Sequence, residues 1–249
     1  MHEASFHEKN CFITLTYNNE NLPIDGSLNK EHFQLFIKRY RKWLSKTGQK
    51  IRYYHCGEYG AKLSRPHYHA CIFGHDFEDK EVHSVRDGTM LYKSKKLSEL
   101  WSKGFVTIGE VNFNSAAYVA RYILKKQNGK NAEQHYKQFD QYTGEIYQDR
   151  NLQPEYTTMS RNKGIGHKYI EKYLKQTYAY DEVVVKGKSV KPPRYYDQQL
   201  QLQDPKKYEH IKKQRIKDIN KEDNTPDRLK TKEIVKRTQI KKLKRSIED

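Results

Sequence analysis

Hydrophobic and polar positions follow two different periods in the first half of the chain. Short runs rich in β-branched and aromatic residues predict four strands, at residues 11–17, 51–58, 67–73 and 104–111. Between the first two, residues 30–45 place apolar side chains at helical spacing on one face. Another helix is predicted at 114–126, capped by Asn114, and a weak one at 95–103. Because the connections are short, the pattern predicts an α+β fold whose antiparallel sheet carries helices on one face.

The pattern weakens after residue 127. A turn at 164–166 precedes a short amphipathic helix at 167–176, and Pro192-Pro193 is typical of a linker. From residue 194 onward, 17 Lys and Arg stand against 10 Asp and Glu, with few aliphatic residues. Such a composition cannot build much of a core. We therefore expect one domain at residues 1–180 and a basic, partly helical tail at 181–249. A solvated tail is favoured over a basic arm that lies on DNA.

The charge balance narrows the choice of partner. The chain has 48 Lys and Arg against 31 Asp and Glu, a formal net charge of +17. Such an excess favours a polyanion, and nucleic acid is the commonest one. A membrane is disfavoured because no stretch approaches the roughly 20 apolar residues of a spanning helix. The start of the sequence has no features of a signal peptide, so we expect a cytoplasmic protein.

Tyrosine and cysteine usage agree with this interpretation. Many of the 20 tyrosines lie beside Lys or Arg, where rings and cations suit bases and phosphates. An A/T-rich genome would also raise the tyrosine content. The three cysteines, Cys11, Cys56 and Cys71, fall in apolar runs, which predicts reduced core thiols and no disulfide framework.

A metal site is predicted where two strands meet. His67 and His69 are two residues apart on one strand, so they point the same way. Glu58 ends the preceding strand, and antiparallel pairing would bring it close to His67. Two imidazoles and one carboxylate suit Mn²⁺, or Mg²⁺ in the presence of phosphate, although zinc accepts the same ligands. The alternative is a pair of surface histidines beside the turn at Arg65-Pro66.

Two tyrosines lie one turn apart on the predicted helix at 114–126. Taking Tyr118 as the origin, Tyr122 falls at roughly 40° and Lys125 at roughly −20°, with Arg121 alongside. The apolar set occupies the other side: Ala116, Val119, Ala120, Ile123 and Leu124. We therefore expect both tyrosines to face away from the core, among cations that favour a phenolate. Base stacking without chemistry is the alternative.

Several segments together resemble one superfamily: residues 12–17, Cys56-Gly57-Glu58-Tyr59-Gly60, Arg65-Pro66-His67-Tyr68-His69, Tyr118-Val119-Ala120-Arg121-Tyr122 and residues 160–166. They are similar to the HUH endonucleases, named for two histidines around a bulky residue. Within these, the chain resembles the rolling-circle replication initiators of the microviruses, small single-stranded DNA phages, in the gokushovirus branch. The resemblance covers roughly residues 1–175, and the double tyrosine is its most specific part.

The resemblance implies a fold and a mechanism. The fold would be an antiparallel sheet of about five strands with flanking helices, similar to an RNA-recognition module. One tyrosine would attack a phosphodiester of single-stranded DNA at the viral origin and keep the 5′ phosphate. The freed 3′ hydroxyl would prime a host polymerase. The second tyrosine would then release and close the strand, with the metal held by Glu58, His67 and His69.

The resemblance also suggests partners and two departures. Arg65, Arg121, Lys125 and Lys126 are the candidate DNA-binding residues, and a host helicase and polymerase are the expected partners in the cytoplasm of a bacterial host. Family members often carry more sequence before the equivalent of Met1. Lys163 stands where the family pattern leads us to expect proline.

Two alternatives remain at this stage. A transposase or relaxase of the same superfamily would need only one nucleophile, so Tyr118 and Tyr122 would differ sharply in importance. A non-catalytic nucleic-acid-binding protein would show salt-dependent binding and no covalent adduct.

Overall fold

The computed structural model describes residues 1–60, 64–86, 88–121, 126–129, 132–139 and 146–242. The chain divides into two compact units, Met1–Ile165 and Gly166–Asp249. Helix α5 (His167–Tyr180), which the sequence placed at the end of the first domain, lies in the second of these units. No helix among the described residues is long and apolar enough to cross a membrane.

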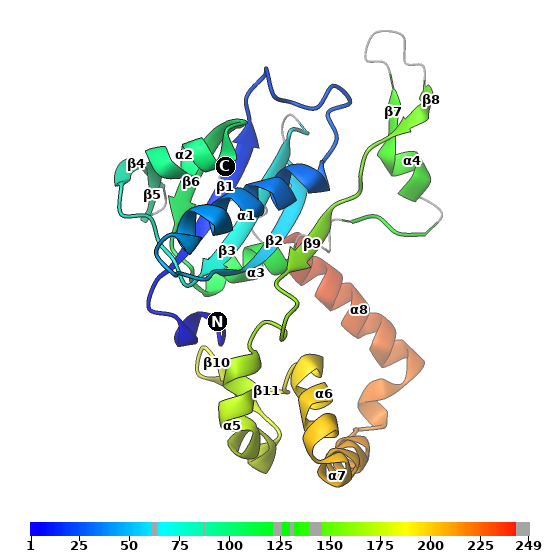
Figure 1. Ribbon diagram of the computed structural model, residues 1–249. Coiled ribbons are helices and arrows are strands. Elements are labelled where there is room, and N and C mark those ends of the chain that lie inside the picture. Colours follow the sequence, from blue (N-terminus) through cyan, green and yellow to red (C-terminus); the bar gives the residue numbers. More distant parts are fainter. Residues whose placement is uncertain (61–63, 87, 122–125, 130–131, 140–145, 243–249) are drawn as a thin grey trace. The chain divides into compact units, whose positions relative to one another are not determined.

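The first unit is built on a seven-stranded sheet with the order β4-β5-β6-β1-β3-β2-β9 (Figure 1). All of its neighbouring strands run antiparallel. The strands are β1 (Asn10–Tyr17), β2 (Arg52–Tyr59), β3 (Pro66–Phe73), β4 (Lys80–Arg86), β5 (Thr89–Ser94), β6 (Gly104–Gly109) and β9 (Tyr156–Met159). The four strands expected from the sequence and the antiparallel α+β class are confirmed.

The expected strand number of about five is wrong, because the pattern missed three strands at the edges of the sheet. β4 and β5 carry charged and polar side chains at most positions, so they contain no apolar run. β9 has only four residues, among them two threonines. A separate pair in this unit, β7 (Lys137–Phe139) and β8 (Ile146–Asn151), follows the short helix α4 (Ala132–Tyr136).

Two helices cover one face of the sheet and form the main core. α1 (Lys30–Ser45) begins at Asn29, whose side chain accepts hydrogen bonds from the backbone of Glu31 and His32. α2 (Lys95–Trp101) packs beside it and is capped by Ser94. The buried side chains of both helices meet the inward positions of β1, β3 and β6 in one cluster, which includes Ile13, Leu15, Phe33, Phe36, Tyr40, Tyr68, Ile72, Trp101 and Ile108.

The third helix, α3 (Phe113–Arg121), lies against β2 and β3. Its Tyr118 contacts Phe12, whose neighbours Cys11 and Ile13 point into the core on the opposite face. The expectation that all helices share one face is therefore wrong. Asn112, not Asn114, caps α3, because its side chain accepts hydrogen bonds from the backbone of Asn114 and Ser115. The three cysteines are free and buried, as predicted.

The second unit has a core of its own. It contains α5, the hairpin of β10 (Val183–Val185) and β11 (Lys188–Val190), and the helices α6 (Arg194–Gln203), α7 (Pro205–Lys217) and α8 (Pro226–Lys241). The buried cluster consists of Ile170, Tyr178, Val183, Tyr196, Leu200 and Ile211. The expectation that the segment after residue 181 cannot build much of a core is wrong, because tyrosines supply much of the missing apolar surface.

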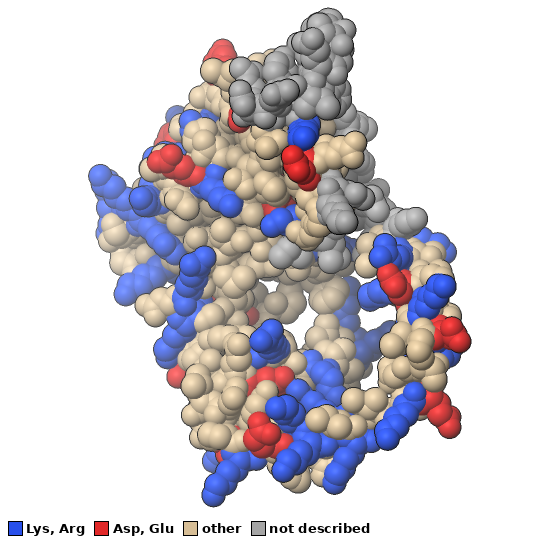
Figure 2. All heavy atoms as spheres, turned by 90° about the vertical axis from the view of Figure 1, so that its right-hand side faces the viewer, with Lys and Arg blue, Asp and Glu red and all other residues tan. Residues whose placement is uncertain are grey.

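The surface of this unit is rich in cations. Arg215 pairs with Asp181 and Asp197, and Tyr178 also donates to Asp197, which ties α7 to α6 and to the end of α5. Exposed lysines and arginines cover α7 and α8, and Lys and Arg side chains predominate over acidic ones on the face shown in Figure 2.

Candidate functional site

The predicted metal ligands share one face of the sheet. The β2–β3 register places Glu58 directly opposite His67, and Cys56 opposite His69. The predicted cross-strand approach of Glu58 to His67 is therefore confirmed. Glu58 and His69 are buried, at 3% and 1% exposure, whereas His67 is half-buried. The sheet thus provides two histidines and a carboxylate at its α3 face, with the His67 end the more exposed.

Two threonines of β1 orient the histidine rings. Thr14 lies opposite His69, and its Oγ1 is 2.9 Å from His69 Nδ1. Thr16 lies opposite His67, and its Oγ1 is 3.0 Å from His67 Nδ1. Occupying both Nδ1 atoms leaves the Nε2 edges as the ligating edges, as at metal sites where a second residue fixes the imidazole. The sequence analysis missed these threonines, although Thr14-Leu15-Thr16 has the same two-residue period as His67-Tyr68-His69.

Glu58 lies at the centre of a buried hydrogen-bond group. Its Oε1 is 2.8 Å from His69 Nε2 and accepts a hydrogen bond of 3.1 Å from the hydroxyl of Tyr118. The Tyr118 ring lies edge-on to His69, with ring centroids 5.0 Å apart, and edge-on to Phe12. One carboxylate therefore links a predicted ligand to a predicted nucleophile.

The burial of Tyr118 overturns the helical-wheel expectation. Its side chain is only 5% exposed, and the buried positions of α3 are Ser115, Tyr118 and Val119. α3 packs on a sheet face that presents polar groups, so its tyrosine side is the one that turns inward. The Arg121 guanidinium donates to the backbone oxygen of Ala117 and stays along the helix.

The remaining predicted residues are placed as follows. Tyr122 and Lys125 lie outside the described residues, and Lys126 is exposed. Arg65 braces the end of β1, where its guanidinium donates to the Tyr17 carbonyl at 2.8 Å and to Asn19 Oδ1 at 2.6 Å. DNA binding by these cations stays a prediction.

Gly60 determines access to His67. A Cβ atom built at Gly60 would lie 2.7 Å from His67 Nε2, closer than real Cβ contacts allow. Glycine at this position therefore leaves room at the predicted ligating edge of His67.

The donor types fit a divalent cation, and the arrangement is not a ready-made cluster. Two imidazole nitrogens and one carboxylate suit Mn²⁺, and Mg²⁺ when phosphate supplies further oxygens. The ring centroids of His67 and His69 are 6.4 Å apart. Within the described part of the chain, no three His, Cys, Asp or Glu side chains form a preassembled metal cluster. Metal binding by Glu58, His67 and His69 stays a prediction.

The turn that departs from the family pattern is held by Arg52. Its guanidinium donates to the carbonyls of Asn162, Lys163 and Gly164, and its Nε lies 2.6 Å from Glu3 Oε1. Lys163 has φ +56°, a conformation that the ring of proline does not permit. The backbone of this turn therefore excludes the proline that we expected.

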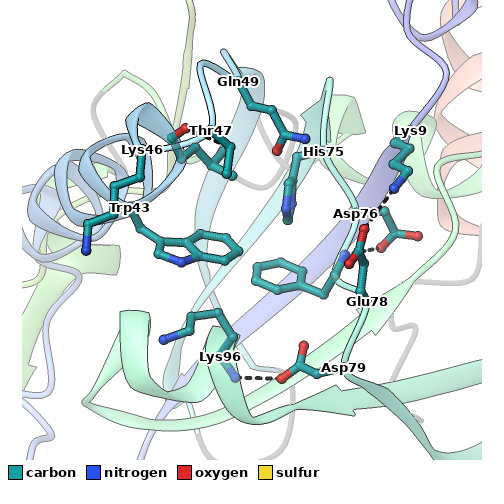
Figure 3. Close-up of a pocket in the computed structure, with 12 residues that line it drawn as sticks. Lys9, Trp43, Lys46, Thr47, Gln49, His75, Asp76, Glu78, Asp79 and Lys96 are labelled. Atoms are coloured by element: carbon teal, nitrogen blue, oxygen red, sulfur yellow. Dashed lines mark hydrogen bonds and ion pairs between the residues drawn. The ribbon is translucent and has the colours of Figure 1, made fainter.

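A cavity of about 480 Å³ lies at the other end of β3. It is lined by the end of α1, by residues 75–79 and by Lys96, and Trp43 and His75 point into it (Figure 3). None of the predicted site residues lines this cavity, so it is separate from the histidine face.

Fold and site together have the features that the resemblance implies: an antiparallel sheet, paired histidines with a carboxylate, and a tyrosine on the facing helix. Residues 10–127 match the family described as replication-associated protein ORF2. The chain belongs to this family of phage replication-associated proteins, as the sequence resemblance predicted.

Individual relatives agree. The chain is 36% identical over 214 residues to replication-associated protein VP4 of Bdellovibrio phage phiMH2K, a match that covers 83% of this chain and 62% of the relative. It is 37% identical over 220 residues to replication-associated protein ORF2 of Spiroplasma virus 4, covering 84% and 63%. A match to replication-associated protein ORF4 of Chlamydia phage 1 is 38% identical and covers 50% of this chain and 32% of that one. The chain therefore spans less than two thirds of the length of these relatives. No solved structure matches the chain significantly.

Proposed function

We propose that this protein is the replication initiator of a small single-stranded DNA phage. It nicks one DNA strand at the viral origin through a 5′-phosphotyrosine intermediate and later rejoins the strand. The relatives are phage replication-associated proteins, which supports a role in replication. The single observation that carries the chemistry is the buried hydrogen bond from Tyr118 to Glu58, beside His69.

Tyr118 is the proposed nucleophile. Its phenolic oxygen forms a bond to the phosphorus of the scissile phosphodiester, and the bond from phosphorus to the 3′ oxygen breaks. The phenol loses its proton, and the departing 3′ oxygen takes up a proton to become a hydroxyl. Because an unperturbed phenol has a pKa of about 10, it needs help to react at neutral pH. Glu58 orients the hydroxyl and can accept its proton. Rejoining is the reverse transfer, in which a 3′ hydroxyl attacks the phosphotyrosine and frees the phenol.

Glu58, His67 and His69 would hold the divalent cation, with Mn²⁺ or Mg²⁺ as the candidates. Such a cation neutralises charge on the phosphate under attack. Thr14 and Thr16 contribute by fixing the two imidazoles.

The second proposed nucleophile is Tyr122, one helical turn after Tyr118 in the sequence. Arg65, Arg121, Lys125 and Lys126 would bind the phosphates of the single strand. A host polymerase that extends the 3′ hydroxyl and a host helicase are the proposed partners, in the cytoplasm of the bacterial host.

The test is incubation of the full chain with single-stranded DNA of the phage origin and Mn²⁺, followed by a denaturing gel. We expect a covalent protein–DNA adduct that protease treatment removes. The absence of an adduct with the wild type, together with salt-dependent binding, would support a non-catalytic binding protein instead.

Single substitutions assign the roles. Tyr118→Phe and Tyr122→Phe should each impair the complete cycle, and the double variant should form no adduct. If one of the two variants keeps the full cycle, the protein is a single-tyrosine enzyme. His69→Ala should abolish cleavage while DNA binding persists, and an adduct of wild-type yield in this variant would contradict the metal role.

A further inference from the structure

An exposed phenylalanine lies in the middle of the sheet. Phe105 of β6 is 65% exposed, whereas Val106 and Ile108 of the same strand are buried in the core. Since side chains on a strand alternate between faces, Phe105 points to the face opposite α1 and α2. An exposed apolar side chain by itself is ordinary, so the position of Phe105 must decide whether it has a role.

The strand register places Phe105 level with the histidine site. Phe105 lies opposite Thr16, Thr16 lies opposite His67, and His67 lies opposite Glu58. Directly opposite residues in antiparallel strands share a face, and the Thr16–His67 hydrogen bond confirms it for this row. The strands β6, β1, β3 and β2 are consecutive in the sheet (Figure 1). At a spacing of about 4.8 Å between neighbouring strands, Phe105 and His67 are separated by about 10 Å.

This row is open on the Phe105 side. Thr16 and His67 are half-buried, whereas Thr14, His69 and Tyr118 in the neighbouring part of the site are buried. A strand of DNA whose phosphate reaches His67 would therefore continue most easily across Thr16 toward Phe105. Lys103, just before β6, and Arg65, just before β3, stand at the same end of these strands and supply positive charge for phosphates.

The backbone before Phe105 is tightly constrained. Gly104 has φ +145°, and a Cβ atom there would lie 2.3 Å from the backbone nitrogen of Asn18. Only glycine lets β6 begin this close to the end of β1. The ring of Phe105 is therefore presented from a rigid, paired strand position.

We propose that Phe105 is a stacking platform for a base of the single-stranded DNA substrate, close to the scissile phosphate. The subsite takes nucleobases of any sequence, because every base offers a π-face. It fixes the nucleotide beside the scissile phosphate and so aligns that phosphate with the histidine row. This inference rests on the proposed function, since it takes single-stranded DNA as the substrate.

The test measures binding without cleavage. The full chain, with a chelator present, is titrated into a fluorescently labelled oligothymidine of about 16 nucleotides. We expect Phe105→Ala to weaken binding by about tenfold or more, as base–aromatic stacking contributes elsewhere. Phe105→Leu keeps an apolar side chain without a π-face and should lose as much, whereas Phe105→Tyr and Phe105→Trp should bind as the wild type does. Val82→Ala is the matched control, because Val82 is 62% exposed in the same sheet and lies outside this row.

A second readout follows the contact itself. In Phe105→Trp, the added indole should be quenched when the oligothymidine binds, beyond any change from Trp43 and Trp101 in the wild type. Wild-type affinity in Phe105→Ala, wild-type affinity in Phe105→Leu, or an unquenched indole would each overturn the stacking role. A chain that shows the stacking pattern and forms no covalent adduct with origin DNA and Mn²⁺ contradicts the proposed function alone. A chain that forms the adduct and binds equally well as Phe105→Ala contradicts the stacking alone.

Discussion

The hydroxyl of Tyr118 donates a hydrogen bond of 3.1 Å to Glu58 Oε1, although the two residues are 60 positions apart in the sequence. The same oxygen lies 2.8 Å from His69 Nε2. A group that must react with a phosphate is thus held by a group that is expected to bind the metal, which couples the position of the nucleophile to the ligand set.

Replacing Tyr118 with Phe should remove adduct formation by this residue while the fold persists. The change deletes one buried hydrogen bond, so we expect the free energy of unfolding to fall by about 1 kcal/mol. Thermal unfolding and the denaturing-gel assay measure the two effects. Tyr180→Phe is the control, because Tyr180 is 79% exposed and should change neither quantity. A Tyr118→Phe protein that forms the adduct as Tyr180→Phe does, in a Tyr122→Phe background, would exclude Tyr118 as a nucleophile.

Thr14→Val and Thr16→Val should weaken Mn²⁺ binding by about ten- to a hundredfold. Valine keeps the shape of threonine but cannot hold the Nδ1 atom of the opposite histidine, so the imidazole loses its fixed orientation. Calorimetric titration with Mn²⁺ measures the effect. Thr107→Val is the matched control, since Thr107 lies opposite Thr14 on the same face but on the β6 side, away from the histidines. Equal Mn²⁺ affinities in all three variants would show that the threonines do not position the ligands.

Gly60→Ala should reduce Mn²⁺ affinity through a steric effect on His67. The new methyl group would lie 2.7 Å from His67 Nε2, so either the ring or the turn must move. Gly109→Ala serves for comparison, because a Cβ atom there makes only ordinary contacts, the nearest at 3.5 Å. If Gly60→Ala binds Mn²⁺ as tightly as Gly109→Ala, then His67 Nε2 is not a ligand.

The sequence was sufficient to predict the histidine row because it depends on local rules. Alternation along a strand puts His67 and His69 on one face, and the short connection to the preceding strand sets the register that brings Glu58 opposite His67. The same alternation could have revealed Thr14 and Thr16. The packing of α3 is not local. A helical wheel shows which residues share a side, but it does not show that the neighbouring sheet face is polar and accepts Tyr118.

The missed elements have a similar explanation. β4 and β5 are strands because they pair with each other and with β6, and not because they carry an apolar run. The core of the second unit depends on tyrosines that lie among lysines in the sequence, such as Tyr178 and Tyr196. Composition assigned these residues to the surface, because it does not record which side of a helix each ring occupies.

The stability of the protein should fall when the pH drops below about 6.5, and His55 should account for part of the loss. His55 is fully buried, stacks on Phe33 and hydrogen-bonds Thr158 through Nδ1. Burial, with a smaller contribution from His69, holds the pKa of His55 well below its usual range. Above the unfolded pKa both states are neutral and this contribution to stability is complete. Below it, the unfolded chain binds a proton that the folded chain does not, so stability decreases by about 1.4 kcal/mol per pH unit.

Urea unfolding between about pH 7.5 and pH 5 measures this slope. Burial also lowers the pKa of His75 and His32, so the wild-type slope contains their contributions. The difference between variants isolates His55. His55→Gln should flatten the slope, because glutamine does not titrate, whereas His83→Gln should leave it unchanged, because His83 is exposed. A slope in His55→Gln equal to that in His83→Gln would mean that His55 takes up its proton equally well in both states, contrary to its burial.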